Sequence, residues 1–228
     1  MTPKFHKPFS PIIMETEAPK KFVDAINKTA DKVLGSEAAS VECDWSHMLV
    51  GKVHKEVRIP IKGKEAKQLL LNVMKSACLD YLKESINQGN HHAWKKLAGD
   101  AVPTLNNIHL THSWVISQYA GEYNPWHHHT GDFSAVIYLK LPPNMHKEIE
   151  EDFEDHYPAN GLIEFMFGEN QRFRSDNLKF KPVVGKMLVF PSWLKHFVYP
   201  FKSEDERRSM SFNAHMHIPT PTKEYKLS

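Results

Sequence analysis

The stretch "GKMLVFPSWLKHFVYP", residues 185–200, places a proline corner between two short apolar segments. Gly185 is typical of a tight turn, and the apolar run "MLVFP" that follows it predicts a buried β-strand. The corner "PSW" at 191–193 then turns the chain, and His196 stands at the start of the next strand. A histidine in this position is well placed to face the mouth of a β-barrel or sandwich.

Short strand patterns of this kind fill the sequence from residue 107 onward. We predict further strands in "NIHLTHSWVISQY", "DFSAVIYLKLP", "GLIEFMF" and "RRSMSFNAHMH". Gly, Pro or charged turns separate them, and regularly spaced short strands are typical of a β-sandwich or barrel. The acidic stretch at 144–160 interrupts the series, and we predict that it is an exposed, irregular insertion.

The first half of the chain has a different pattern. Apolar residues recur at helical spacing within 18–35 and again within 64–89, which predicts two amphipathic helices. Between them, "VRIP" at 57–60 predicts an edge strand. Helices that precede a series of strands can pack on one outer face of a sheet, so the fold class is α+β with a β-sandwich core.

Length and composition favour one globular domain. The chain has 228 residues, of which 41% are hydrophobic and 25% are charged, and its net charge of +2 is too weak to indicate a nucleic-acid partner. We expect a single domain over 1–228, in which 1–105 form a helical and edge-strand support and 106–220 form the β-core. The chain has only two cysteines and no signal-like or membrane-length apolar run, which favours a cytoplasmic protein.

A run of three histidines at 127–129 lies just before the predicted strand "DFSAVIYLKLP". Side chains at i and i+2 near a strand end point the same way, so His127 and His129 share one face and His128 faces the other. A non-haem iron site needs three protein ligands with open positions opposite them. His196 is the candidate that a neighbouring strand would supply, which completes a predicted metal site.

A second polar pattern follows the distal histidine. Arg207 and Ser209 lie at i and i+2 of a predicted strand and therefore share one face. An arginine beside a serine can hold a carboxylate through a bidentate salt bridge and a hydroxyl hydrogen bond. Arg208 would point to the opposite face, so only one of the two arginines can point into the sandwich.

Together these residues resemble the iron(II)- and 2-oxoglutarate-dependent dioxygenase superfamily. The likeness is strongest to an oxygenase branch of bacteria and phages with the patterns "HxHxGxxSxVxYLK" and "GxxLxFPSWLxHxVxPxxxxxxRxSxSFN", which this chain carries at 127–140 and 185–213. The chain is also similar to prolyl 4-hydroxylase-like enzymes. The resemblance covers residues 114–213 and includes the order of the motifs.

The resemblance implies a double-stranded β-helix, or jelly roll, with Fe(II) at its mouth and 2-oxoglutarate chelating the metal. It implies that His127 and His196 are metal ligands. It also implies that Arg207 and Ser209 hold the far carboxylate of 2-oxoglutarate. Tyr138 occupies the place where related hydroxylases direct a tyrosine to the same carboxylate.

Two choices stay open in the sequence. Better-known members of the superfamily carry His-x-Asp where this chain has His127 followed by His129. Strand spacing favours His129 as the third ligand, although a turn could fold Asp132 back, and its carboxylate would neutralise part of the Fe²⁺ charge. If Asp132 is not a ligand, we expect it to orient a histidine. The family pattern selects Arg207, which leaves Arg208 as an ordinary surface charge.

The function that the resemblance implies is hydroxylation of an unidentified substrate with 2-oxoglutarate and O2, releasing succinate and CO2. A protein or peptide side chain such as proline is one candidate substrate, beside a free amino acid, a nucleotide or a small metabolite. The alternatives are a cupin-like metal-binding jelly-roll enzyme that does not use 2-oxoglutarate, and a non-catalytic binding module. We expect no membrane or nucleic-acid partner, and a homodimer would be common.

Overall fold

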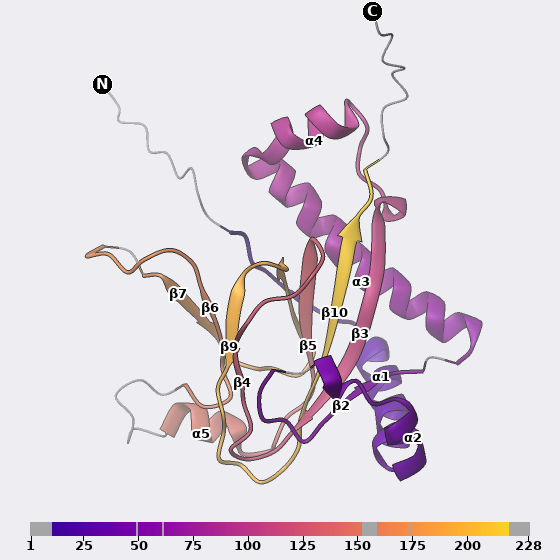
Figure 1. The fold of residues 1–228 in the computed structure, drawn as a ribbon, viewed down its shortest axis with the longest axis vertical. Coiled ribbons are helices and arrows are strands. Elements are labelled where there is room, and N and C mark those ends of the chain that lie inside the picture. Colours follow the sequence, from indigo (N-terminus) through magenta and orange to yellow (C-terminus); the bar gives the residue numbers. More distant parts are fainter. Residues whose placement is uncertain (1–10, 49, 61, 152–158, 174, 219–228) are drawn as a thin grey trace, which may run out of the picture.

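The computed structural model describes residues 11–48, 50–60, 62–151, 159–173 and 175–218 (Figure 1). Two antiparallel sheets form the β-core, with strand orders β1-β8-β5-β10-β3-β2 and β4-β9-β6-β7. The strands are β1 (Met14–Glu17), β2 (Lys55–Arg58), β3 (Ile108–Gln118), β4 (Asn124–His127), β5 (Phe133–Lys140), β6 (Ile163–Met166), β7 (Asn177–Phe180), β8 (Lys186–Pro191), β9 (Lys195–Val198) and β10 (Arg207–Met216).

The strand order is that of a jelly roll. The four central strands of the larger sheet, β8, β5, β10 and β3, accompany the four strands of the smaller sheet, and β1 and β2 extend the larger sheet at its two edges. The predicted edge strand is therefore confirmed as β2, and the α+β class with a β-sandwich core is confirmed as well. The sequence patterns did not predict β1, β4 and β7, because each has only four residues and lacks a clear apolar alternation.

Alternation along β10 divides its side chains between the two faces of the larger sheet. Met210 and Phe212 are fully buried in the main hydrophobic core. Arg207, Ser209 and the polar residues at 211 and 213 are also buried, but they line a cavity on the opposite face. A strand with one apolar and one polar buried face indicates that the cavity between the sheets is built to hold a polar ligand.

Helices cover the outer face of the larger sheet (Figure 1). Phe22 and Ile26 of one helix and Leu70 and Met74 of another pack into one core cluster with Ile137 of β5. The described α-helices are α1 (Lys20–Leu34), α2 (Glu37–Glu42), α3 (Lys64–Ser85), α4 (His91–Ala98) and α5 (Met145–Glu151). The long predicted helix does not stop at residue 89 but passes through a π-helical turn, Ile86–Asn90, into α4. Among the described residues, no helix combines the length and the apolar character needed to cross a membrane.

The prediction of an exposed, irregular insertion at 144–160 is wrong for the first residues of this segment. Residues Met145–Glu151 form α5, and Met145 and Ile149 are buried in a small cluster with Leu162 and Phe201. The apolar side chains at i and i+4 explain the packing, because they lie on one face of a helix. The segment 152–158 lies outside the described residues.

Candidate metal centre and cosubstrate pocket

A cavity of about 200 Å³ lies between the two sheets and receives side chains from both. Six of the seven site residues that the sequence patterns predicted line this cavity, and the seventh, Asp132, does not. The six are His127, His129, Tyr138, His196, Arg207 and Ser209. These residues come from four different strands and one loop, so the fold assembles a polar site from segments that are distant in the sequence.

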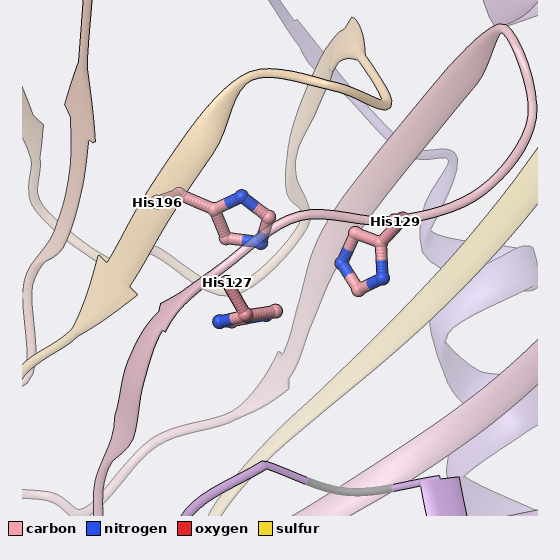
Figure 2. A group of neighbouring side chains, drawn as sticks. All are labelled: His127, His129 and His196. Atoms are coloured by element: carbon pink, nitrogen blue, oxygen red, sulfur yellow. The ribbon is translucent and has the colours of Figure 1, made fainter.

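The three histidines form one cluster. His127 ends β4 and lies directly opposite His196 of β9 in the antiparallel pairing, while His129 follows two residues after the end of β4. One nitrogen from each residue can be chosen so that all three lie within 4.8 Å of one another. Figure 2 shows the three rings grouped around a common space. Three nitrogen donors at this spacing can hold one metal ion and leave its remaining positions open.

Backbone carbonyls fix the orientation of two of the rings in the same way. The Nδ1 atom of His127 lies 2.7 Å from the carbonyl oxygen of Pro125. The Nδ1 atom of His196 lies 3.0 Å from the carbonyl oxygen of Leu194. A carbonyl can only accept, so each Nδ1 is the donor and each Nε2 keeps a free lone pair, which is the arrangement of a metal-binding histidine.

Burial also selects the protonation state that metal binding needs. Removal from water lowers the pKa of His129 to about 3, and it lowers the pKa of His127 and of His196 below the ordinary value. The mutual repulsion of the clustered rings acts in the same direction. The three imidazoles are therefore neutral near pH 7, and the neutral ring is the form that binds a metal.

Asp132 is not brought to the histidine cluster. Its backbone N–H donates to the carbonyl of Ala214 at 2.9 Å, and its carboxylate accepts from the backbone N–H of Met216 at 2.7 Å. Gly131, with φ of +104°, lies so close to the Ala214 carbonyl that a Cβ atom would be 2.8 Å from that oxygen. The turn is thus held against the end of β10, and Asp132 lies 3.5 Å from His215, outside the metal cluster, instead of orienting one of the three clustered histidines.

A separate group of buried polar side chains surrounds Arg207. Its guanidinium donates to the side-chain oxygen of Gln118 and lies over the ring of Tyr138, with 5.1 Å between Cζ and the ring centroid. Three buried atoms of this group have no hydrogen-bond partner among the described residues: Arg207 Nε, the Tyr138 hydroxyl and Gln118 Nε2. Arg207 also has no acidic partner in the part of the chain that the structure describes. A buried cation surrounded by unused donors fits an anionic ligand.

Burial raises the pKa of Tyr138, with the positive charge of Arg207 acting in the opposite direction. The phenol therefore stays protonated at neutral pH and can donate a hydrogen bond to an anion. Ser209, two residues along β10 from Arg207, is buried at 2% exposure and lines the same cavity. The carboxylate of 2-oxoglutarate matches this donor set in charge and in its need for several donors.

Arg208 lies on the other face of β10 and is not a surface charge. Only 4% of its side chain is exposed, and its Nε lies 2.8 Å from Glu206 while its Nη1 lies 2.8 Å from Asp31 of α1. The expectation of an ordinary surface arginine is wrong, because α1 covers this face of the sheet. The alternation along β10 thus leaves Arg207 as the arginine of the cavity.

Sequence reasoning missed part of the cavity wall. Glu56 of β2 and the rings of Trp45, His112 and Trp114 all line it. The strand at 107–119 was predicted from its pattern, but the side chains of β3 at 112, 114 and 116, which line the cavity, were not identified. The signal for Glu56 was weaker, because the pattern at 57–60 did not include it in the edge strand.

Residues 112–213 match the sequence model of a family described as "Putative 2OG-Fe(II) oxygenase". No curated protein matches the chain. Among solved structures, the carbocyclase SnoK of nogalamycin biosynthesis, described as non-heme and alpha-ketoglutarate dependent, gives a TM-score of 0.54 at 12% identity, covering 92% of this chain and 83% of that chain. A Trichoplax adhaerens prolyl hydroxylase, in complex with a hypoxia-inducible-factor peptide fragment, gives 0.52 at 14% identity over 90% and 83%. A Pseudomonas putida prolyl-4-hydroxylase gives 0.49 at 18% identity over 90% and 92%.

The family match indicates the class of protein that residues 112–213 resemble. At such identities the likeness to SnoK and to the Trichoplax enzyme establishes a shared jelly-roll fold and nothing more specific. The matched segment carries the histidine cluster, Arg207 and Ser209, and it confirms the resemblance drawn from the motifs. The segment 112–213 is thus similar to 2OG-Fe(II) oxygenases. The family implies Fe(II) and 2-oxoglutarate as its cofactors and O2 as a further cosubstrate.

Proposed function

We propose that this enzyme hydroxylates a C–H bond of its substrate with O2 and 2-oxoglutarate, releasing succinate and CO2. The observation that carries the proposal is a single cavity with both a three-histidine cluster and a buried arginine that has no acidic partner among the described residues. A metal site alone would fit many jelly-roll enzymes. The additional anion site is the feature expected of a chain that binds a dicarboxylate beside its metal.

In this proposal His127, His129 and His196 hold Fe(II) through one nitrogen each. Three protein ligands would leave the remaining coordination positions of the ion open for 2-oxoglutarate and O2. The chemistry supplied by the bound cofactors is the coupling of O2 reduction to decarboxylation of 2-oxoglutarate and oxidation of the substrate. Because three neutral imidazoles bring no negative charge, the 2-oxoglutarate carboxylate would be the main counter-charge at the metal.

The far carboxylate of 2-oxoglutarate would lie against Arg207. The unused Nε of Arg207, the Tyr138 hydroxyl and Gln118 Nε2 can each donate to it, and Ser209 adds a hydroxyl. Gln118 also holds the guanidinium through its side-chain oxygen, which positions Arg207 before the acid binds. The proposal thus assigns Gln118 the role of orienting the arginine and contributing a donor.

Apolar side chains complete the pocket and limit the access of water. The cavity is also lined by Val136, Ile163, Phe190 and Val198. Exclusion of water strengthens the ionic contact to Arg207 and protects reactive species from side reactions. We propose a protein or peptide side chain, proline among the candidates, as the substrate class, because the fold is shared with a prolyl hydroxylase described in complex with a peptide.

The decisive experiment is an anaerobic titration of the apo-protein with Fe(II) and then with 2-oxoglutarate, following the visible charge-transfer band of the chelate. We expect a band in the wild type and an increase of about tenfold or more in the Kd for 2-oxoglutarate in Arg207→Leu. Tyr138→Phe and Ser209→Ala change less of the packing and should each weaken binding by a smaller factor. Arg172→Ala, at an exposed arginine, should leave the band and the affinity unchanged.

Either of two results would contradict the proposal. A wild-type protein that binds Fe(II) but gives no band with 2-oxoglutarate would favour a metal-binding jelly-roll enzyme with another cosubstrate. An unchanged affinity for 2-oxoglutarate in Arg207→Leu, Tyr138→Phe and Ser209→Ala would mean that the acid does not bind at the buried arginine.

A further inference from the structure

The cavity contains one acidic side chain that the proposed chemistry does not use. Glu56 lies on the edge strand β2, lines the cavity and is only 5% exposed. Its neighbour Val57 points to the other face of the sheet, into the main core. Alternation along β2 therefore fixes the Glu56 carboxyl on the side of the cavity, where a bound substrate can reach it.

Glu56 has no cationic partner among the residues that the structure describes. Against the effect of burial, the indole of Trp114 lowers the pKa of the Glu56 carboxyl, and Asp44 nearby acts in the opposite direction. Arg58, two residues along β2, lies instead over the ring of Trp45 at 5.0 Å from its centroid. Burial raises the pKa of Glu56 to about 8, which reflects how little the surrounding protein does to compensate a charge there. The carboxyl therefore keeps its proton near pH 7 in the free protein, and a ligand that brings a positive charge favours its ionised form.

The Glu56 carboxyl borders the same cavity as the histidine cluster and lies on a different strand from Arg207. Trp114 lies between Glu56 and the histidine cluster, because it influences the pKa of Glu56 while its ring lies 5.6 Å from that of His129. Arg207 belongs to β10, which is separated from β2 by β3. The anionic cosubstrate and a second ligand can therefore occupy the cavity together, with the second ligand between the metal and Glu56.

Aromatic rings line the cavity together with Glu56. Trp45 and His112 line the cavity with ring centroids 5.4 Å apart, and Trp114 completes the group. A carboxylate bordered by indole rings is a combination that binds organic cations, since the carboxylate takes the charge and the ring faces attract it further. A neutral polar group would gain less from the same surroundings.

Building on the proposed function, we propose that Glu56 binds a cationic nitrogen group of the substrate, an ammonium or a guanidinium. The enzyme then oxidises a carbon of a basic molecule or basic side chain, held with its charge on Glu56 and its reactive C–H beside the histidines. Glu56 is a specificity-determining residue in this arrangement, and Trp114 sets the spacing between the charge and the metal.

The test compares cationic probes with neutral probes of similar shape. Protein loaded with Fe(II) and 2-oxoglutarate in the absence of oxygen is titrated by calorimetry with Nα-acetyl-lysine amide and Nα-acetyl-norleucine amide. The corresponding arginine and citrulline compounds form a second pair. We expect the wild type to bind at least one cationic probe about tenfold more tightly than its neutral counterpart. Free lysine and free arginine are titrated in the same way. Tighter binding of the acetylated amides would indicate a side chain within a peptide as the substrate, and tighter binding of the free amino acids would indicate a small amine.

Matched variants separate recognition from folding. Glu56→Gln keeps an acceptor for the Trp114 indole and should lose the preference for the cationic probe, while Glu56→Asp should retain most of it. Glu164→Gln changes a carboxyl of β6 that is equally buried, at 4% exposure, but hydrogen-bonded to Tyr199 outside the cavity wall, and it should keep the preference. The charge-transfer band with 2-oxoglutarate should persist in Glu56→Gln, which shows that the site is folded.

Three outcomes overturn the inference: equal binding of cationic and neutral probes by the wild type, no binding of any cationic probe, or an unchanged preference in Glu56→Gln. These failures are distinguishable from failure of the proposed function. A wild type that gives the 2-oxoglutarate band but shows no preference for a cation refutes only the role of Glu56. A wild type that lacks the band refutes the oxygenase chemistry, whatever the probes do.

Discussion

His129 and Asp132 are three residues apart, yet the backbone directs their side chains to different places. The N–H of His129 donates to the carbonyl of Ser192 at 2.8 Å, which holds this segment beside the corner that precedes His196. Asp132 is held at the end of β10 by its contact with Met216. Spacing alone left both residues open as third ligands, because the turn between them depends on contacts with distant strands.

The first prediction concerns the third ligand. His129→Ala should weaken Fe(II) binding more than about 100-fold, because loss of a ligand costs more than loss of a residue that orients one. Asp132→Ala should change it little. Anaerobic equilibrium dialysis with metal analysis measures both affinities. The reverse pattern, with metal binding lost only in Asp132→Ala, would show that the turn rearranges to bring the carboxylate to the metal.

The second prediction concerns Glu56 and pH. Burial raises its pKa from 4.5 to about 8, so between these values the folded protein keeps a proton that the unfolded chain releases. The contribution of Glu56 to stability is therefore greatest below pH 4.5, falls as pH rises toward 8 and is constant above. The free energy of unfolding of the wild-type apo-protein minus that of Glu56→Gln should follow this curve in urea titrations. A difference that does not vary with pH would show that the carboxyl is not buried as described.

At the scale of elements, a buried ion-pair group joins β10 to α1. Arg208 contacts Glu206 through two nitrogen atoms, and it also reaches Asp31 and Asn27 of the helix. Lys140 and Ser117 complete the environment of the Glu206 carboxylate. The contacts of Arg208 fix the position of the helix on the sheet behind the cavity.

The third prediction follows from this group. Arg208→Ala should destabilise the protein by about 3 kcal/mol, because it leaves the Glu206 carboxylate buried with less compensation. Lys20→Ala removes an exposed helix pair with Asp24 and should cost roughly 0.5 kcal/mol or less. Urea unfolding of the two variants measures the difference. An equally small loss of unfolding free energy in both variants would show that the buried contacts of Arg208 do not stabilise the protein.

Elements differ in how far the sequence predicts them. The central strands were predictable because β5 and β8 are continuous apolar runs, and because β3 and β10 are long. The helix α5 was missed because its two buried side chains, Met145 and Ile149, stand among acidic residues. Tertiary packing against Leu162 and Phe201 decides its conformation, and local pattern does not contain that information.

For the whole molecule, the order of the motifs was enough to predict the fold and most of the candidate site. The structure brings the three histidines, Tyr138, Arg207 and Ser209 to one cavity. Glu56 could not be predicted there, because its place depends on the pairing of β2 with β3 across about 60 residues of intervening sequence. The pairing of β2 with β3 thus brings Glu56, which lies outside the sequence motifs, into the site.

The fourth prediction concerns the stability of the whole domain. Because the histidine cluster and the Arg207 site exist only in the folded chain, ligands that bind there should stabilise it by mass action. At a free concentration about 100 times the Kd the gain is about 2.7 kcal/mol, which raises Tm by roughly 5 to 11 °C for a chain of this size. Anaerobic thermal unfolding with Fe(II) and 2-oxoglutarate measures the shift. In Arg207→Leu, the Tm shift caused by 2-oxoglutarate should be lost and the shift caused by Fe(II) should remain. An equal 2-oxoglutarate shift in the wild type and in Arg207→Leu would contradict the binding of 2-oxoglutarate at Arg207.

The direct pairing of His127 with His196 across β4 and β9 makes the metal centre a test of strand alignment. If either strand slipped by one residue, its histidine would face the solvent side of the sheet and an aromatic neighbour, Trp126 or Phe197, would turn inward. A misaligned chain would therefore bind no metal in this cavity. Metal loading during folding would favour the correctly aligned chains, so the same ion that serves the chemistry would also act as a clamp across the smaller sheet.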